Sequence, residues 1–262
     1  MTTIYTHGDG DGICAASLVK MVPIYQNADV YFSHPMGIVH DINHVRDDVI
    51  ICDIAMDQRE FKGLKRKLEK ITKKGFNVTY IDHHPKPGEL PPSVISVFGE
   101  KVSATELAYR YFYYNIPQSA SRIALIGAIN DYLDKTPLMS ELMLQYQRRT
   151  LFLDAGILAQ GLKDYRRNYD KMRKLVEKFA RGMYPCEVPV LVKKSLRVTR
   201  SDKYAQKEVI QHYKTKKYIA YIKNPHASRS KAAHWIMGDS GKVIGITILN
   251  HRSRDDIVDL TI

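Results

Sequence analysis

Residues 3–12 read TIYTHGDGDG, a run of β-branched and aromatic residues that leads directly into a histidine, two aspartates and alternating glycines. The run predicts a strand, and the glycines predict a tight turn before a helix. Open α/β sheets bind ligands at the carboxyl ends of their strands, so His7, Asp9 and Asp11 can point at one centre. The spacing is not that of a dinucleotide-binding turn, and an EF-hand loop would need a glutamate where Lys20 stands. Taken alone, the segment is more often only a turn.

Four more strands follow this first one, alternating with helical patterns. Apolar residues recur at helical spacing from Phe61 to Ile71, and Ser103 to Glu106 has the form of a capping box that begins a second helix. The expected strands are ADVYFS (28–33), VIICDI (49–54), NVTYID (77–82) and VISVF (94–98). This alternation predicts an α/β fold with an N-terminal, mostly parallel sheet flanked by helices over residues 1–137.

The remaining chain divides into two further segments. Residues 138–182 predict a helical connector, with Gly156 and Gly161 as interruptions and a turn at 182–185 as its end. Residues 183–262 predict a smaller C-terminal α/β domain that binds the substrate. Its expected strands are VPVLV (188–192), YIAYI (218–222), VIGITIL (243–249) and IVDLTI (257–262), and its expected helices lie near 203–213 and 228–237.

Composition and charge limit the classes of function. With 44% hydrophobic residues the chain is not disordered, and no apolar run approaches the ~18 residues that a membrane span needs. Without a signal peptide, and with three widely spaced cysteines, we expect a soluble cytoplasmic protein and no membrane partner. The net charge of +12 arises entirely from residues 151–262, whereas residues 1–50 are acidic. Acidic chemistry beside a basic surface suits a metal site that acts on a polyanion.

Three more acidic or histidine-containing segments follow predicted elements. Asp53 ends an apolar strand, Asp82-His83-His84 ends the next strand, and Asp131 ends an apolar helix. Each has an ordinary interpretation, since Asp53 could cap a helix and Asp131 could be solvated surface. Their order and spacing are more specific than any one of them.

In this order and spacing the sequence resembles the DHH phosphoesterase superfamily, over residues 1 to about 135 and more loosely beyond. It looks most like the archaeal RecJ-like nucleases and the branch that contains oligoribonucleases and phosphoadenosine-phosphate phosphatases. The resemblance implies two metal ions, manganese before magnesium because histidines are among the ligands. It implies that Asp53 bridges both ions, that His84 faces the substrate phosphate and that Asp82 supports the site. The other implied metal ligands are His7, Asp9, Asp11, His83 and Asp131.

One departure from the family concerns the substrate. The family's C-terminal domain grips substrate with a Gly-Gly-Gly-His segment, which this chain lacks, and the chain stops at Thr261-Ile262, about where that segment should start. We therefore expect either a truncated form or a branch without this grip. The candidate substrate-binding residues are instead Arg166, Arg167, Arg229, Lys231, Arg252 and Arg254.

Three hypotheses for function follow. The first is a manganese-dependent exonuclease on single-stranded DNA or RNA, with replication or repair proteins as further partners. The second is hydrolysis of very short oligoribonucleotides, phosphoadenosine phosphate or cyclic dinucleotides by the same centre. The third is a replisome scaffold without catalysis, which the complete set of expected metal ligands argues against.

Overall fold

A computed structural model describes residues 2–165, 168–250 and 257–261. The chain divides into two units, residues 1–195 and 196–262. The boundaries expected at 137 and 182 remain predictions.

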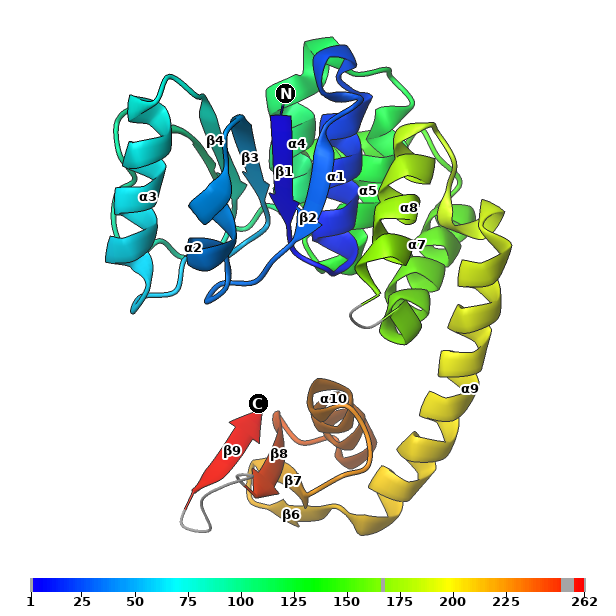
Figure 1. Ribbon diagram of the computed structural model, residues 1–262. Helices are drawn as coiled ribbons and strands as arrows, with labels where there is room; N and C mark the ends of the chain where they lie inside the picture. Colours follow the sequence, from blue (N-terminus) through cyan, green and yellow to red (C-terminus); the bar gives the residue numbers. More distant parts are fainter. Residues whose placement is uncertain (1, 166–167, 251–256, 262) are drawn as a thin grey trace. The chain divides into compact units, whose positions relative to one another are not determined.

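The first unit is built on a five-stranded sheet in which every strand is parallel to its neighbours (Figure 1). Its strand order is β2-β1-β3-β4-β5, so β2 lies on one side of β1, whereas β3 and the strands after it lie on the other side. Such a reversal opens a crevice at the carboxyl ends of the two central strands, here β1 and β3. The strands, all anticipated from the sequence, are β1 (Thr2–Thr6), β2 (Asp29–Phe32), β3 (Asp48–Cys52), β4 (Val78–Asp82) and β5 (Ile95–Phe98).

Helices cover both faces of the sheet, because alternate strand residues point to opposite sides. Ile4 and Ile50 pack against the larger helical layer, whereas Tyr5 and Ile51 pack against the smaller one. The larger layer holds α1 (Gly10–Met21), α4 (Ala104–Phe112), α5 (Ala120–Asn130), α6 (Pro137–Met143), α7 (Arg148–Leu162) and α8 (Tyr169–Ala180). The smaller layer holds α2 (Ile38–Asp41) and α3 (Phe61–Lys73), the amphipathic helix that the apolar spacing predicts. Short 3-10 turns are η1 (Pro23–Tyr25), η2 (Ile42–His44), η3 (Tyr113–Asn115), η4 (Lys163–Tyr165) and η5 (Pro185–Glu187).

The start of α4 confirms one half of the predicted capping box. The Ser103 hydroxyl oxygen accepts a hydrogen bond from the Glu106 amide at 3.0 Å. The buried Glu106 carboxylate does not return to Ser103: it pairs with Arg110 and accepts a hydrogen bond from the Thr136 hydroxyl at 2.8 Å. The glutamate therefore joins α4 to the start of α6, where Thr136 is the N-cap.

The helical region after residue 137 corrects two expectations. Gly156 and Gly161 do not interrupt a helix, since both lie inside α7. A Cβ atom at Gly161 would lie 2.4 Å from Leu191 Cδ1, so the glycine serves a close helix contact. Leu191 belongs to α9 (Pro189–His212), a helix that includes all but the first residue of the VPVLV run expected to be a strand. Proline is favoured in the first turn of a helix, and burial of Leu191 against α7 outweighs the strand preference of the valines.

The second unit has a four-stranded sheet in the order β6-β7-β8-β9, with β7 and β8 parallel and the edge pairs antiparallel. Its strands are β6 (Lys214–Lys216), β7 (Ile219–Lys223), β8 (Ile244–Asn250) and β9 (Val258–Thr261). Helix α10 (Arg229–Ser240) packs on β7 and β8 through Ala232 and Ile236.

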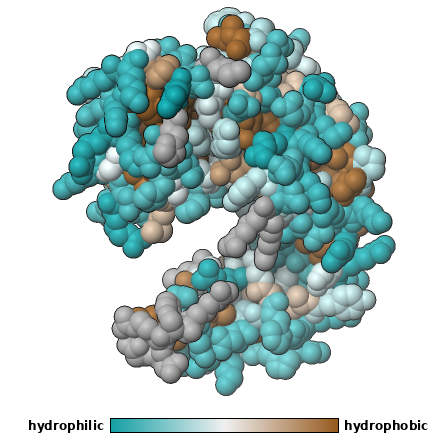
Figure 2. All heavy atoms as spheres, viewed as in Figure 1, coloured by the Kyte–Doolittle hydropathy of each residue, from teal (hydrophilic) through white to brown (hydrophobic). Residues whose placement is uncertain are grey.

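In the face drawn in Figure 2, hydrophilic residues dominate the surface. None of the helices described is both long enough and apolar enough to cross a membrane.

Candidate metal centre

The turn from β1 into α1 fixes the first pair of polar groups. Asp9 is the N-cap of α1, and its Oδ1 accepts a hydrogen bond from the Gly12 amide at 3.0 Å. Its Oδ2 lies 2.7 Å from His7 Nδ1. This hydrogen bond raises the pKa of His7. Desolvation acts to raise the pKa of Asp9, but the bonds from His7 and Gly12 outweigh it and lower that pKa to about 2. Asp9 is therefore a carboxylate at neutral pH.

Asp53 lies one residue beyond the end of β3 and has a φ of +56°, a left-handed conformation that few residues other than glycine adopt. Its amide still donates to the Ile81 carbonyl at 2.9 Å, so the pairing with β4 continues through the bend. The side chain is buried, and its Oδ2 has no hydrogen-bond partner. Burial, together with the nearby carboxylates of Asp11 and Asp9, raises the pKa of Asp53 well above its ordinary value. Strained backbone and an unpartnered buried oxygen are both typical of functional positions.

Asp11 is held by a helix that begins more than ninety residues later in the chain. Its two carboxylate oxygens accept hydrogen bonds from the Ala104 and Thr105 amides, at 2.8 and 2.9 Å, at the N-terminus of α4. The Thr105 hydroxyl also donates to the Asp11 carbonyl at 2.8 Å. Sequence reasoning missed this role of residues 104 and 105, although the capping motif at Ser103 marked the helix start that supplies the amides.

The Asp82-His83-His84 segment at the end of β4 places two imidazoles in different surroundings. His84 Nδ1 lies 2.8 Å from Oδ1 of the buried Asp82, and this bond raises the pKa of His84. His83 Nε2 lies 3.3 Å from Asp131 Oδ2, 3.5 Å from Asp53 Oδ1 and 4.0 Å from Asp11 Oδ2. Burial lowers the pKa of His83 despite these carboxylates, which favours the neutral imidazole that metal ions bind.

Asp131 reaches the site because α5 packs closely against α1. A Cβ atom at Gly10 would lie 2.4 Å from Asn130 Oδ1, so glycine is needed where the two helices meet. Asn130 Nδ2 donates to the Ile126 and Ala155 carbonyls, which ties the end of α5 to α7. Asp131 caps this helix end, where a carboxylate opposes the helix dipole unless a cation lies near.

These side chains form three overlapping groups whose potential ligand atoms lie within 4.8 Å of one another. The groups are His7, Asp9 and Asp53; Asp11, His83 and Asp131; and Asp53, Asp82, His83 and His84. Oxygen and imidazole ligands without thiolates fit a hard or borderline divalent ion, and such an ion would satisfy the buried oxygen of Asp53. The structure thus brings together all eight residues that the sequence placed at the site, while their individual roles remain predictions.

The expected substrate-binding residues give a less complete picture. Arg229 is exposed at the start of α10, and Lys231 pairs with Asp202, all in the second unit. The other four, Arg166, Arg167, Arg252 and Arg254, lie outside the described residues.

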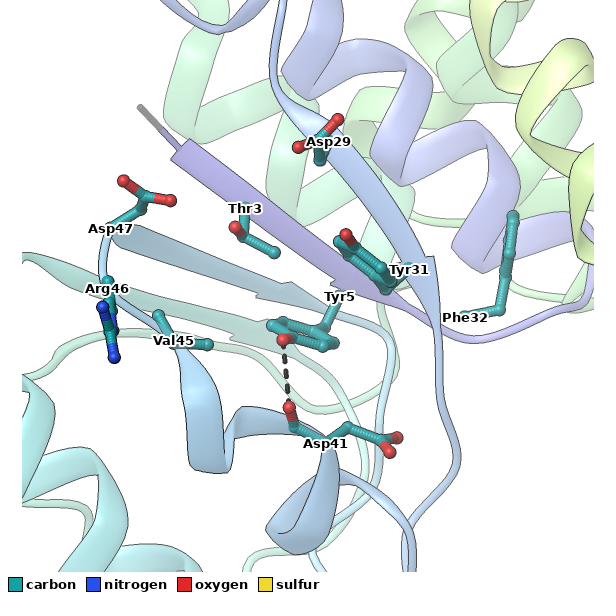
Figure 3. A pocket seen from close by; sticks show the side chains of 9 residues that line it. All are labelled: Thr3, Tyr5, Asp29, Tyr31, Phe32, Asp41, Val45, Arg46 and Asp47. Carbon is teal, nitrogen blue, oxygen red and sulfur yellow. Dashed lines mark hydrogen bonds between the residues drawn. The ribbon is translucent and has the colours of Figure 1, made fainter.

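A separate cavity of about 440 Å³ lies against β1 and β2 on the face that carries the smaller helical layer (Figure 3). Tyr5 and Tyr31 stack there with ring centroids 5.7 Å apart, and the Tyr5 hydroxyl donates to the Asp41 carbonyl at 3.2 Å. None of the eight site residues lines this cavity, so it is distinct from the candidate metal centre.

Comparisons with known proteins match this description. Residues 1–133 match the family profile described as "DHH family, N-terminal domain". The fold is similar to that of an exonuclease RecJ bound to manganese, with a TM-score of 0.58 and 16% identity over 95% of this chain and 74% of that one. It is also similar to the DHH domain of a protein assigned to a family of ribosomal proteins, with a TM-score of 0.63 and 14% identity over 95% and 71% of the two chains.

A third similar structure is a pGpG-specific phosphodiesterase from Vibrio cholerae, with a TM-score of 0.61 and 13% identity over 99% of this chain and 81% of that one. No curated protein matches the sequence.

Proposed function

The chain belongs to the DHH family, and from this premise we propose that it is a manganese-dependent exonuclease on single-stranded nucleic acid. Its cluster of acidic residues and histidines reproduces the metal-dependent phosphoesterase centre of that family. The observation that carries the proposal is the convergence of four aspartates and two histidines at the ends of β1, β3, β4 and α5, around the unpartnered oxygen of Asp53. A scaffold protein has no need of four carboxylates this close together, two of them buried, since each raises the cost of ionising the next.

Two of the three groups suggest the ligands of each ion. His7 and Asp9 would hold the first ion, and Asp11, His83 and Asp131 the second, with Asp53 between them. Manganese fits better than magnesium because imidazole nitrogens are present, and RecJ, which shares the fold, was solved with manganese. Bound as a pair, such ions polarise the phosphate and lower the pKa of a water molecule.

The protein's own residues would orient the substrate. The bond from Asp82 occupies His84 Nδ1 and leaves Nε2 as the nitrogen available to a ligand. Because that bond also raises the pKa of His84, the imidazole favours its protonated form, which can donate a hydrogen bond to a phosphate oxygen. His84 is thus suited to hold the scissile phosphate, and Asp82 to position His84.

The charge distribution favours a polymeric substrate. The whole excess of +12 arises from residues 151–262, and a surface this basic suits a polyanion that makes several contacts. The pGpG-specific phosphodiesterase of similar fold acts on a dinucleotide, so short oligonucleotides are the second candidate.

The test is a product ladder from 5′- and 3′-end-labelled DNA and RNA of two to twenty nucleotides, with manganese or with a chelator. The proposal expects stepwise shortening from one end with manganese, no reaction with chelator, and no reaction by Asp53→Asn in the same buffer. Cleavage of dinucleotides alone would favour the second candidate. A wild-type protein that cleaves none of these substrates with manganese would overturn both.

A further inference from the structure

A second cavity, of about 250 Å³, opens directly beside the candidate metal centre, and His7 lines both. We propose that this cavity receives the nucleobase of the nucleotide next to the scissile phosphate, an inference that rests on the proposed function. It makes the natural substrate a nucleotide chain rather than inorganic polyphosphate.

The wall of the cavity is aromatic. Phe32 at the end of β2 and Tyr169 at the start of α8 stack with ring centroids 5.7 Å apart and planes 17° from parallel. Figure 3 shows the Phe32 side chain pointing away from that of Tyr31, as expected for neighbouring residues of a strand, although Phe32 also borders the 440 Å³ cavity. Phe32 is buried, whereas 43% of Tyr169 is exposed. The tyrosine ring is therefore backed by a fixed ring and still open to a flat partner, which is the arrangement on which nucleobases stack.

The rest of the described lining favours a base over a second phosphate as the occupant. Leu162 and Met172 add apolar surface, and no lysine or arginine is among the described residues that line the cavity. Among these described residues, none is a lysine or arginine of the kind that normally neutralises a bound phosphate. The exposed His34 supplies a polar group at the rim, whereas the Ser33 hydroxyl already donates to Asp41 at 2.5 Å. Few polar groups beside a stacking wall, among the described residues, suit a planar ring with little preference among bases.

A glycine of the metal-binding turn also borders the cavity. A Cβ atom at Gly8 would lie 2.8 Å from Met172 Cε and 3.9 Å from Phe32 Cδ1. Any side chain there would push against the cavity wall within one residue of His7. The same turn thus presents the metal-binding groups on one side and leaves room for a ring on the other. The volume equals that of about eight water molecules at ~30 Å³ each, which is ample for a base.

The test compares each substrate with a copy whose terminal nucleotide next to the cleaved bond lacks its base. For the wild-type protein the abasic copy should have a KM about tenfold higher or more, as expected for loss of one base stack. In Tyr169→Ala the ratio of the two KM values should fall close to one. In Tyr169→Phe, which keeps the ring, the ratio should stay close to that of the wild-type protein. Tyr114→Ala is the matched control, because Tyr114 is 94% exposed and lies in η3, outside the cavity.

A binding titration gives a readout that does not depend on turnover. With metal-free protein, a nucleoside 5′-monophosphate should bind more tightly than ribose 5-phosphate, and Tyr169→Ala should remove that difference. Equal binding of the two ligands to the wild-type protein, or a KM ratio unchanged in Tyr169→Ala, would overturn the inference. Failure of the proposed function is distinguishable, because it would appear as no hydrolysis of any nucleic acid while the difference in binding persists.

Discussion

The metal-free protein should lose stability as the pH rises from 5 to 8, because a buried carboxyl group must ionise without a cation. Asp11 is 2% exposed. Burial raises its pKa from 3.8 to about 7, even though hydrogen bonds from Thr105 act in the opposite direction. When the pKa of a carboxyl group is higher in the folded protein than in the unfolded chain, the folded state is favoured at low pH, where the group is protonated in both states. This contribution is lost as the pH rises from the pKa of the unfolded chain to the pKa of the folded protein.

The size of the effect follows from these two values. At pH 5 Asp11 is already ionised in the unfolded chain but still protonated in the folded one. Between pH 5 and its folded pKa of about 7 the free energy of unfolding should fall by about 1.4 kcal/mol per pH unit, or about 3 kcal/mol in all. Manganese should cancel the loss, because a bound cation favours the ionised carboxylate.

The assay is urea unfolding at pH 5, 6, 7 and 8 with chelator and with saturating manganese. Asp11→Asn is the reference variant: it forfeits a hydrogen bond from α4, so it is less stable at pH 5, but its stability should vary less with pH. Asp11 is also among the charges that raise the pKa of Asp53, so the difference in pH slope between the two proteins measures Asp11 together with its effect on Asp53, and both act in the same direction. Equal pH slopes for the wild-type and Asp11→Asn proteins in chelator would refute the reasoning.

Four further substitutions test the site. Asp53→Asn should abolish hydrolysis and manganese binding. At pH values above 7 it should also raise the urea midpoint of the metal-free protein, because it removes a buried charge. Unchanged binding of manganese in calorimetry would contradict the bridging role of Asp53. His83→Ala should lower both manganese affinity and turnover, whereas His84→Ala should lower turnover about 10²-fold or more with little loss of metal. If His84→Ala lost the metal and His83→Ala kept it, the roles of the two histidines would be the opposite of those proposed. Gly10→Ala should destabilise the fold by about 1–3 kcal/mol and weaken manganese binding, since its Cβ would displace Asn130 beside Asp131; a melting temperature within a degree of wild type would show that α5 does not depend on this contact.

The strands of the first sheet could be predicted because each is a short β-branched run that ends in a turn or a polar group, as in TIYTH before Gly8. The same rule failed for VPVLV, where the run begins a long helix. Its valines prefer strands, yet the packing of Leu191 on Gly161 of α7 decides the conformation. That contact joins two segments thirty residues apart and leaves no periodic signal in either one.

The candidate site was predictable as a set of residues but not as a geometry. Carboxyl ends of parallel strands meet at one edge, so His7, Asp53 and His83 could be placed together from the order of the strands. The left-handed backbone of Asp53 and the amides of α4 that hold Asp11 could not be inferred, because both depend on tertiary packing. The stacked Phe32 and Tyr169 were likewise hidden, since nothing in either local sequence indicates the other.

The most direct test of the account is a crystal structure of the protein soaked in manganese, measured at a wavelength where manganese scatters anomalously. A two-metal centre predicts two anomalous peaks about 3.5–4 Å apart, with Asp53 in contact with both, His7 and Asp9 at one, and Asp11, His83 and Asp131 at the other. A single peak, no peak, or two peaks that Asp53 does not join would contradict the two-metal centre on which the proposed hydrolysis depends.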